Sequence, residues 1–161
     1  MTAADALAQA ARISGSAARW DVARHPLETV KRPAFEELLR AYNNAEPLWA
    51  AALRLGISAS CTIARVEDGN VIALMVGPGL GTRSEKRVGR NVMEWADTGY
   101  AKVVRDRSIA AREQPVFHCN DIPIDGMRCR YETLAFPDGK PGGSGTVFIA
   151  SHIISKELIT A

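Results

Sequence analysis

Histidines and cysteines are the side chains in this sequence best suited to ligate a metal or to act in catalysis, and their spacing supports neither role. The three histidines are far apart in the sequence, and the three cysteines include no Cys-x-x-Cys pair. These residues are His25, His118, His152, Cys61, Cys119 and Cys129. The chain also lacks a His-Glu-x-x-His motif, a kinase signature and a Ser-His-Asp spacing. We therefore expect no metal site, nominate no catalytic residue, and interpret the cysteines as buried thiols.

A glycine-rich stretch, GPGLG at 77–81, follows a predicted strand in the manner of a phosphate-binding loop. A dinucleotide fingerprint needs G-x-G-x-x-G opening a helix, and a P-loop needs Gly-Lys followed by Ser or Thr. The sequence has neither pattern. We interpret this stretch as a flexible connector.

Composition indicates one globular domain with an N-terminal extension. The chain has 161 residues, of which 47% are hydrophobic and 24% are charged. No apolar run approaches the ~20 residues that span a bilayer, and no secretory signal is evident, so we expect a soluble cytoplasmic protein without membrane contact. The net charge is only +2, and aromatic residues make up 6% of the chain. Without a nucleic-acid motif, these values argue against a nucleic-acid partner.

Helical periodicity begins at Pro33. Residues 1–32 read as a weakly ordered extension that includes a short alanine-rich helix over 2–13. Residues 33–56 form a predicted helical segment of two helices, or of one kinked helix, which Gly56 can end. Its first apolar stripe is Phe35, Leu38, Leu39 and Tyr42.

Five strands are predicted over the domain that we place at 57–156, with a C-terminal tail at 157–161. The first two, 60–66 and 70–76, flank an Asp-Gly step that is typical of a hairpin. A helical region over 92–95 and 98–112 follows. The last three strands are predicted at 115–122, 127–136 and 146–154, with a glycine-rich turn before the final strand. This order predicts an α+β fold, a five-stranded antiparallel sheet with helices mainly on one face.

The final strand predicts cover on both faces of the sheet. If the last hairpin closes symmetrically, one face carries Cys129, Tyr131, Thr133, Phe148, Ala150 and His152, and the other carries Leu134, Val147, Ile149 and Ile153. Both sets include apolar residues, although a sheet with one solvated face should alternate apolar and polar residues. The helical segment at 33–56 can supply the second cover, either on its own sheet or on a second subunit. The interface candidates are Phe35, Leu38, Leu39, Tyr42, Val147, Ile149 and Ile153.

Residues 58–155 resemble the PAS domain family. The resemblance rests on the opening hairpin, on VGRN at 88–91, on GMRCRYETLAFPDG at 126–139 and on the closing TVFIASHII strand. It implies a sheet with the strand order 2-1-5-4-3 and a ligand cavity between the sheet and the middle helices. The candidate lining residues are Met93, Trp95, Tyr100, Tyr131 and His152.

The resemblance does not extend to the cofactors of better-known PAS sensors. Light-sensing flavin members have a cysteine after the Gly-Arg-Asn step, where this chain has Val92, so no thiol can form the photo-adduct there. Haem-binding members take an axial histidine from a middle helix, and no histidine lies between residues 77 and 115. We therefore expect neither flavin nor haem.

These observations favour a non-catalytic bacterial signalling module that acts by protein–protein interaction, by sensing a small molecule, or by both. The resemblance implies a homodimer or a partner such as a histidine kinase or regulator. The alternative is a small α+β cone-shaped enzyme of the cyclase or isomerase type, with His118 or Asp121 as its base. A five-stranded sheet in the order 2-1-5-4-3 favours the signalling module, and a longer six-stranded cone would refute it.

Overall fold

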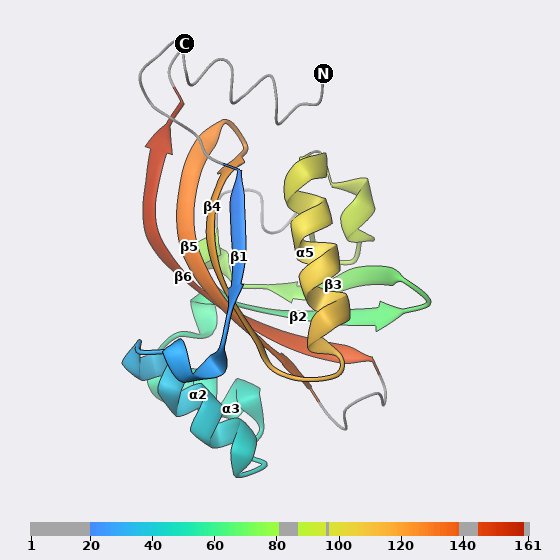
Figure 1. Cartoon of the computed structure of the whole chain (residues 1–161). Coiled ribbons are helices and arrows are strands. Elements are labelled where there is room, and N and C mark those ends of the chain that lie inside the picture. Colours follow the sequence, from blue (N-terminus) through green and yellow to red (C-terminus); the bar gives the residue numbers. More distant parts are fainter. Residues whose placement is uncertain (1–19, 81–86, 96, 139–144, 160–161) are drawn as a thin grey trace.

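The computed structural model describes residues 20–80, 87–95, 97–138 and 145–159. It shows an α+β fold in which a strongly curved sheet carries helices on both faces (Figure 1). The strands are β1 (Asp21–His25), β2 (Cys61–Glu67), β3 (Asn70–Val76), β4 (Val116–Ile124), β5 (Met127–Pro137) and β6 (Thr146–Leu158). The helices are α2 (Pro33–Asn43), α3 (Leu48–Leu55) and α5 (Thr98–Ala111), with short 3-10 turns η1 (Leu27–Thr29), η2 (Ser58–Ser60), η3 (Pro78–Leu80) and η4 (Val92–Glu94).

Two expected features lie outside the described residues, namely the helix over 2–13 and most of the glycine-rich turn before β6. At the other end of the chain, β6 continues to Leu158, two residues into the predicted tail. No helix in the described ranges is long and apolar enough to cross a membrane.

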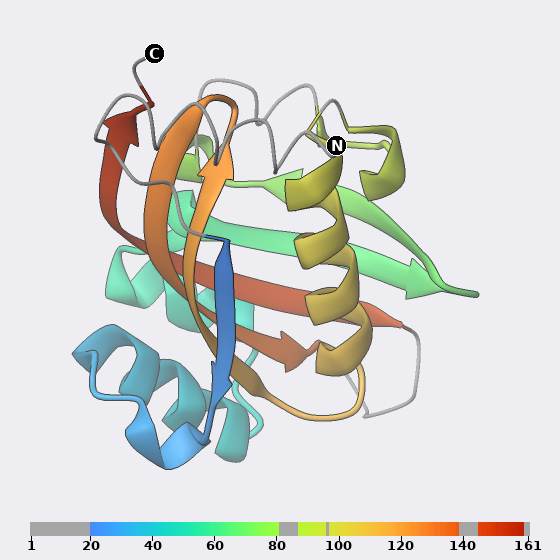
Figure 2. The ribbon, with the colours of Figure 1, turned by 45° about the horizontal axis from the view of Figure 1, so that its top comes forward.

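All strands of the sheet are antiparallel, in the order β1-β4-β5-β6-β2-β3 (Figure 2). The five predicted strands are all present, and read from β3 they follow the order 2-1-5-4-3. The predicted count of five was wrong, because β1 adds a sixth strand at the edge beside β4. β1 pairs through its backbone while its side chains stay largely outside the core, so its sequence has no apolar alternation that predicts a strand.

Two Asp-Gly pairs make the tight turns of the sheet. Asp68 and Gly69 have φ angles of 50° and 77° between β2 and β3, and Asp125 and Gly126 have φ angles of 51° and 77° between β4 and β5. Positive φ at both central residues is the requirement of the two-residue turn that matches the twist of antiparallel strands. These turns fix which side chains of each hairpin face each other.

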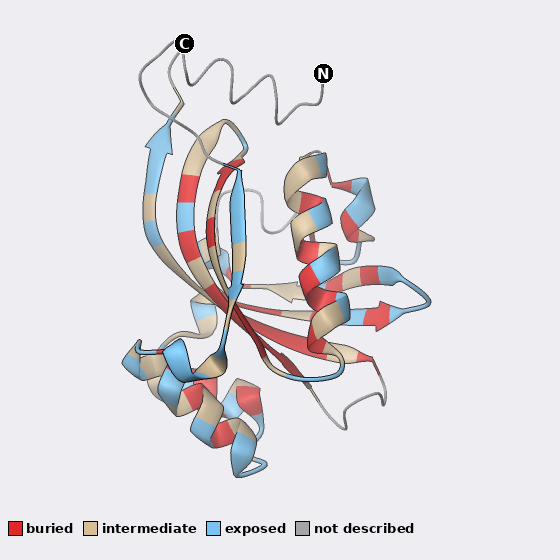
Figure 3. Ribbon diagram, in the orientation of Figure 1, coloured by how far each residue is buried: buried red, intermediate tan, exposed pale blue. Residues whose placement is uncertain are grey.

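Helices cover both faces of the sheet: α5 covers one face, and α2 and α3 supply the second cover that the final strand predicts. α2 and α3 pack on the face that carries Phe117, Phe136 and Phe148, and α5 packs on the opposite face. Phe35 and Leu38 of α2 are buried in this chain's own core. The helical segment at 33–56 therefore folds back on its own sheet, and the burial pattern follows both layers (Figure 3).

The register of the last hairpin differs by one residue from the symmetric closure expected. Leu134 pairs with Ala150, and Thr133 pairs with Ser151. Because successive residues of a strand point to opposite faces, a shift of one residue exchanges the two sets. The interface candidates are corrected accordingly: Val147, Ile149 and Ile153 lie on the α5 face, opposite to the face that Phe35, Leu38, Leu39 and Tyr42 cover.

Candidate functional site

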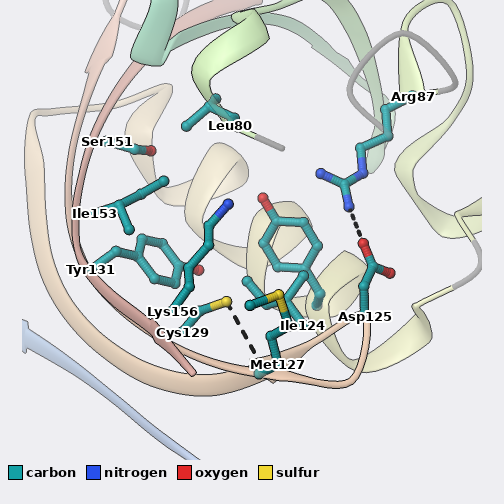
Figure 4. Close-up of a pocket in the computed structure, with 11 residues that line it drawn as sticks. Leu80, Arg87, Ile124, Asp125, Met127, Cys129, Tyr131, Ser151, Ile153 and Lys156 are labelled. Atoms are coloured by element: carbon teal, nitrogen blue, oxygen red, sulfur yellow. Dashed lines mark hydrogen bonds and ion pairs between the residues drawn. The ribbon is translucent and has the colours of Figure 1, made fainter. Parts of the chain in front are cut away.

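A cavity of about 280 Å³ lies where the first turn of α5 faces the β4–β5 hairpin and the distal half of β6 (Figure 4). Its walls come from η3, from Arg87 between η3 and η4, from α5, and from β4, β5 and β6 with the β4–β5 turn. The lining residues are Leu80, Arg87, Tyr100, Ile124, Asp125, Met127, Cys129, Tyr131, Ser151, Ile153 and Lys156.

A β-bulge in β6 determines which residues of this strand face the cavity. Tyr131 pairs with Ile153, but the preceding Arg130 pairs with Ser155, so Ile154 has no partner on β5. Ile154 is correspondingly exposed. Beyond the bulge the alternation is reversed, and Lys156 pairs with Cys129 on the cavity face. Without the extra residue, Lys156 would point to the opposite face of the sheet.

Arg87 is a buried cation at one wall of the cavity. Only 8% of the residue is exposed, and its Nη2 atom lies 3.0 Å from Asp125 Oδ2. The guanidinium also lies 5.3 Å from the ring centroid of Trp95 and 5.1 Å from that of Tyr100. The Asp125 carboxylate and two aromatic rings thus hold this charge in place. A guanidinium that lies over the face of an aromatic ring is attracted to it by a cation–π interaction.

Lys156 is the second cation of the cavity. In Figure 4 its amino group extends from β6 toward the middle of the cavity. The residue is exposed to solvent. No carboxylate in the described ranges forms an ion pair with it. Among the residues that the structure describes, the cavity lining therefore carries two cations and one carboxylate, Asp125.

Tyr131 places a buried polar atom beside these charges. The residue is 6% exposed, and its hydroxyl has no hydrogen-bond partner within the described residues. Burial raises the pKa of Tyr131, although the nearby Arg107 guanidinium lowers it in part. The hydroxyl therefore keeps its proton at neutral pH and is a free donor.

Arg107 lies behind the ring of Tyr131, with its guanidinium carbon 5.9 Å from the ring centroid. It is 4% exposed and donates from Nη2 to Asn120 Oδ1 at 2.6 Å. Asn120 Nδ2 in turn donates to the Tyr131 carbonyl and to Thr133 Oγ1, both at 3.1 Å. No carboxylate forms an ion pair with Arg107 in the parts of the chain that the structure covers, so a net positive charge is buried beside the cavity.

The structure brings two of the five predicted lining residues, Tyr100 and Tyr131, to the cavity wall. Trp95 is in the next layer, with its ring centroid 5.7 Å from that of Tyr100. Met93 lies outside the lining and is 47% exposed on η4. His152 is opposite Glu132 on the other face of the sheet, because the hairpin register differs by one residue from the expected one.

Sequence reasoning missed five polar or reactive lining residues: Arg87, Asp125, Cys129, Ser151 and Lys156. Two of them had a usable signal. Asp125 begins an Asp-Gly pair like the one at the first hairpin, and Cys129 is two residues from Tyr131 on the same strand. Lys156 had none, because its orientation depends on the bulge.

The candidate bases of the alternative enzyme do not come together. His118 and Asp121 are three residues apart on β4 and point to opposite faces of the sheet. Burial, and the positive charge of Arg107 after it, lower the pKa of His118 to about 4. Asp121 accepts hydrogen bonds from Arg128 at 3.0 and 2.8 Å. Neither residue is therefore placed as half of an acid–base pair.

The three thiols are protonated at neutral pH. Burial raises the pKa of Cys61 to about 12 and raises the pKa values of Cys119 and Cys129 as well. Within the described ranges no three side chains of the metal-binding types lie close enough to hold an ion together.

No protein-family model matches the chain, and neither a curated protein nor a solved structure matches it. The geometry of the cavity is therefore the basis for a functional proposal.

Proposed function

We propose that this chain is a PAS-type signalling module that binds a small molecule in the cavity beside α5. The strand order carries the proposal. Five of the strands follow the order 2-1-5-4-3, and α5 precedes the third of them and packs across their inner face. The cavity lies between that helix and the sheet, where the PAS resemblance implies a ligand site.

The lining supports binding rather than core packing alone. Apolar side chains share the wall with two cations, a carboxylate and a buried tyrosine hydroxyl that has no acceptor among the described residues. Such a mixture of apolar surface and a few convergent polar groups is typical of ligand pockets. At about 280 Å³ the cavity is near the lower end of their usual range, roughly 300–1,000 Å³, which favours a small molecule over haem or flavin.

The partner of the module belongs to the proposal as well. A histidine kinase, a regulator or a second copy of the chain would receive the signal. Because Phe35 and Leu38 are buried in the chain's own core, the apolar face of α2 is not free to make that contact. The partner would therefore dock on another surface.

Native mass spectrometry of the full chain tests the ligand proposal. We expect a small molecule that stays bound in native spectra and is released on denaturation. Ile153→Trp should remove it by filling the cavity, whereas Ile154→Trp is the matched control, since Ile154 is next in sequence and 53% exposed. Equal occupancy in the two variants would contradict the proposed site. An empty protein that binds nothing in a thermal-shift screen of metabolites would refute ligand binding.

The cone-shaped enzyme is a second candidate, and the sheet itself favours it. Six strands are present, and β5 and β6 are long, with 11 and 13 residues. The signalling module and the enzyme are distinguished by whether the protein converts the molecule that it binds. One compound recovered unchanged after incubation favours the signalling module, and conversion of that compound to a second product favours the enzyme.

A further inference from the structure

We infer that the cavity binds a small monocarboxylate with an apolar body, held by Tyr131 and Lys156. This inference rests on the proposed function, because it assigns a chemical class to the ligand of that site. Its two parts, one negative charge and an apolar body, are argued from different lining residues.

The charges of the described lining residues point to an anion, and the carboxylate of Asp125 disfavours a second negative charge on it. Asp125 already pairs with Arg87 at 3.0 Å, which leaves Lys156 as the cation without a carboxylate in the described part of the chain. One carboxylate on the ligand would neutralise it. A doubly charged phosphate would instead bring a second negative charge next to Asp125, and like charges in a partly dry site repel strongly.

Tyr131 supplies the hydrogen bond that such an anion needs. Its buried hydroxyl donates to no acceptor among the described residues, and leaving a buried donor unsatisfied is unfavourable. A carboxylate oxygen in the cavity would accept a hydrogen bond from this hydroxyl and so satisfy the buried donor. Arg107, buried behind the same ring, adds positive potential at this point.

The remaining wall suits an apolar body. Leu80, Ile124, Met127 and Ile153 line the cavity, and in Figure 4 Ile153 and Leu80 lie on the side away from the pair of Arg87 and Asp125. Burial of an apolar group there is favourable at roughly 25 cal/mol per Å². A purely polar dicarboxylate would leave this surface without a partner.

Calorimetric titration of the full chain with matched acid and amide pairs tests the inference. The probes are phenylacetate with phenylacetamide, and hexanoate with hexanamide, which differ in charge but little in shape. We expect each acid to bind at least about tenfold more tightly than its amide, because a hydrogen bond to a charged group contributes ~1.5–3 kcal/mol.

Two variants locate the carboxylate. Tyr131→Phe should weaken acid binding at least about tenfold, since it removes a buried donor to a charged group. Lys156→Met should weaken it only about fivefold, because an exposed ion pair is screened by water. Neither change should affect the amides to the same extent. Lys102→Met is the control, because this lysine is exposed on α5 and lies outside the cavity lining.

The outcomes separate this inference from the proposed function. Equal binding of acid and amide would overturn the anion assignment and leave a ligand cavity in place. If neither acid binds while Ile153→Trp expels a co-purified neutral molecule, the anion assignment is also overturned and the ligand cavity is retained. Acid binding that responds to Lys102→Met but to neither cavity variant would overturn the assigned site. If no acid or amide binds and no molecule co-purifies, the inference and the proposed function both fail.

Discussion

Replacing Asn120 by alanine should destabilise the protein strongly, because it strips a buried cation of its acceptor. Arg107 is 4% exposed, and its Nη2 atom donates to Asn120 Oδ1 at 2.6 Å. The same amide donates to the Tyr131 carbonyl and to Thr133 Oγ1. Asn120→Ala therefore leaves the guanidinium unpaired between α5 and the sheet and removes two further hydrogen bonds.

The magnitude follows from the burial of the charge. A hydrogen bond to a charged group contributes about 1.5–3 kcal/mol and an ordinary one about 0.5–1.5 kcal/mol, so losing one of the first kind and two of the second should lower the free energy of unfolding of Asn120→Ala by about 2.5–6 kcal/mol. Arg107→Met removes the charge itself and leaves only a neutral amide unsatisfied, which costs about 1–3 kcal/mol. Domains are commonly stable by about 5–15 kcal/mol, so folded baselines should remain measurable.

A double-mutant cycle isolates the interaction. Urea unfolding at pH 7, followed by far-ultraviolet circular dichroism, gives the free energy of unfolding of each variant. We expect the double variant to be more stable than the sum of the single effects predicts, by about 1.5–3 kcal/mol. Arg105→Met is the control, because Arg105 is on the same helix but its Nε atom donates to the Gly69 carbonyl at 3.2 Å. Its effect should add to that of Asn120→Ala within about 0.5 kcal/mol. If the effects of Arg107→Met and Asn120→Ala also add within about 0.5 kcal/mol, the reasoning is refuted.

Three further predictions concern the core, a turn and the response to pH. Leu38→Ala should lower the free energy of unfolding by about 2–5 kcal/mol in urea titrations, because Leu38 is fully buried, whereas the same change at the exposed Leu53 should have little effect. Gly145→Ala should cost more than about 1 kcal/mol in the same assay, since φ is +79° and a Cβ atom would lie 2.3 Å from the Val66 carbonyl oxygen. His118 has a folded-state pKa of about 4, below its unfolded value of 6.5, so it stabilises the fold above pH 6.5 and this contribution is lost as the pH falls toward 4. Melting temperatures across this range should fall less in His118→Gln than in the parent; identical profiles would contradict the buried, neutral state of His118.

The fold was largely predictable because most of its elements carry strong local signals. Pro33 at the first turn of α2, Gly56 after α3 and the Asp-Gly pair of the first hairpin each restrict the backbone directly. β1 carries no such signal. It is held to β4 by backbone pairing, and that long-range contact has no counterpart in the local pattern of residues 21–25.

The site was less predictable because it depends on register. Tyr100 and Tyr131 could be nominated as aromatic residues on the helix and strand that were expected to face each other. His152 was assigned to the wrong face because the last hairpin does not close symmetrically, a shift of only one residue. Lys156 could not be found at all, since the reversal of alternation at Ile154 arises from the pairing of β6 with β5. An error of one residue in a predicted register thus misplaces every side chain along a long strand.

The sixth strand, β1, bears on the choice between the signalling module and the enzyme. Because of its position in the sheet, it is weak evidence for the enzyme. β1 pairs with β4 alone, at the edge of the sheet farthest from β3, and it contributes no residue to the cavity lining. The order of the other five strands is the same with or without it. The number of strands therefore reflects an N-terminal addition at one edge, whereas the order of the strands determines which residues surround the cavity. Because the order of the strands, and not their number, brings β5 with Tyr131 next to β6 with Lys156, we give it more weight in the functional proposal.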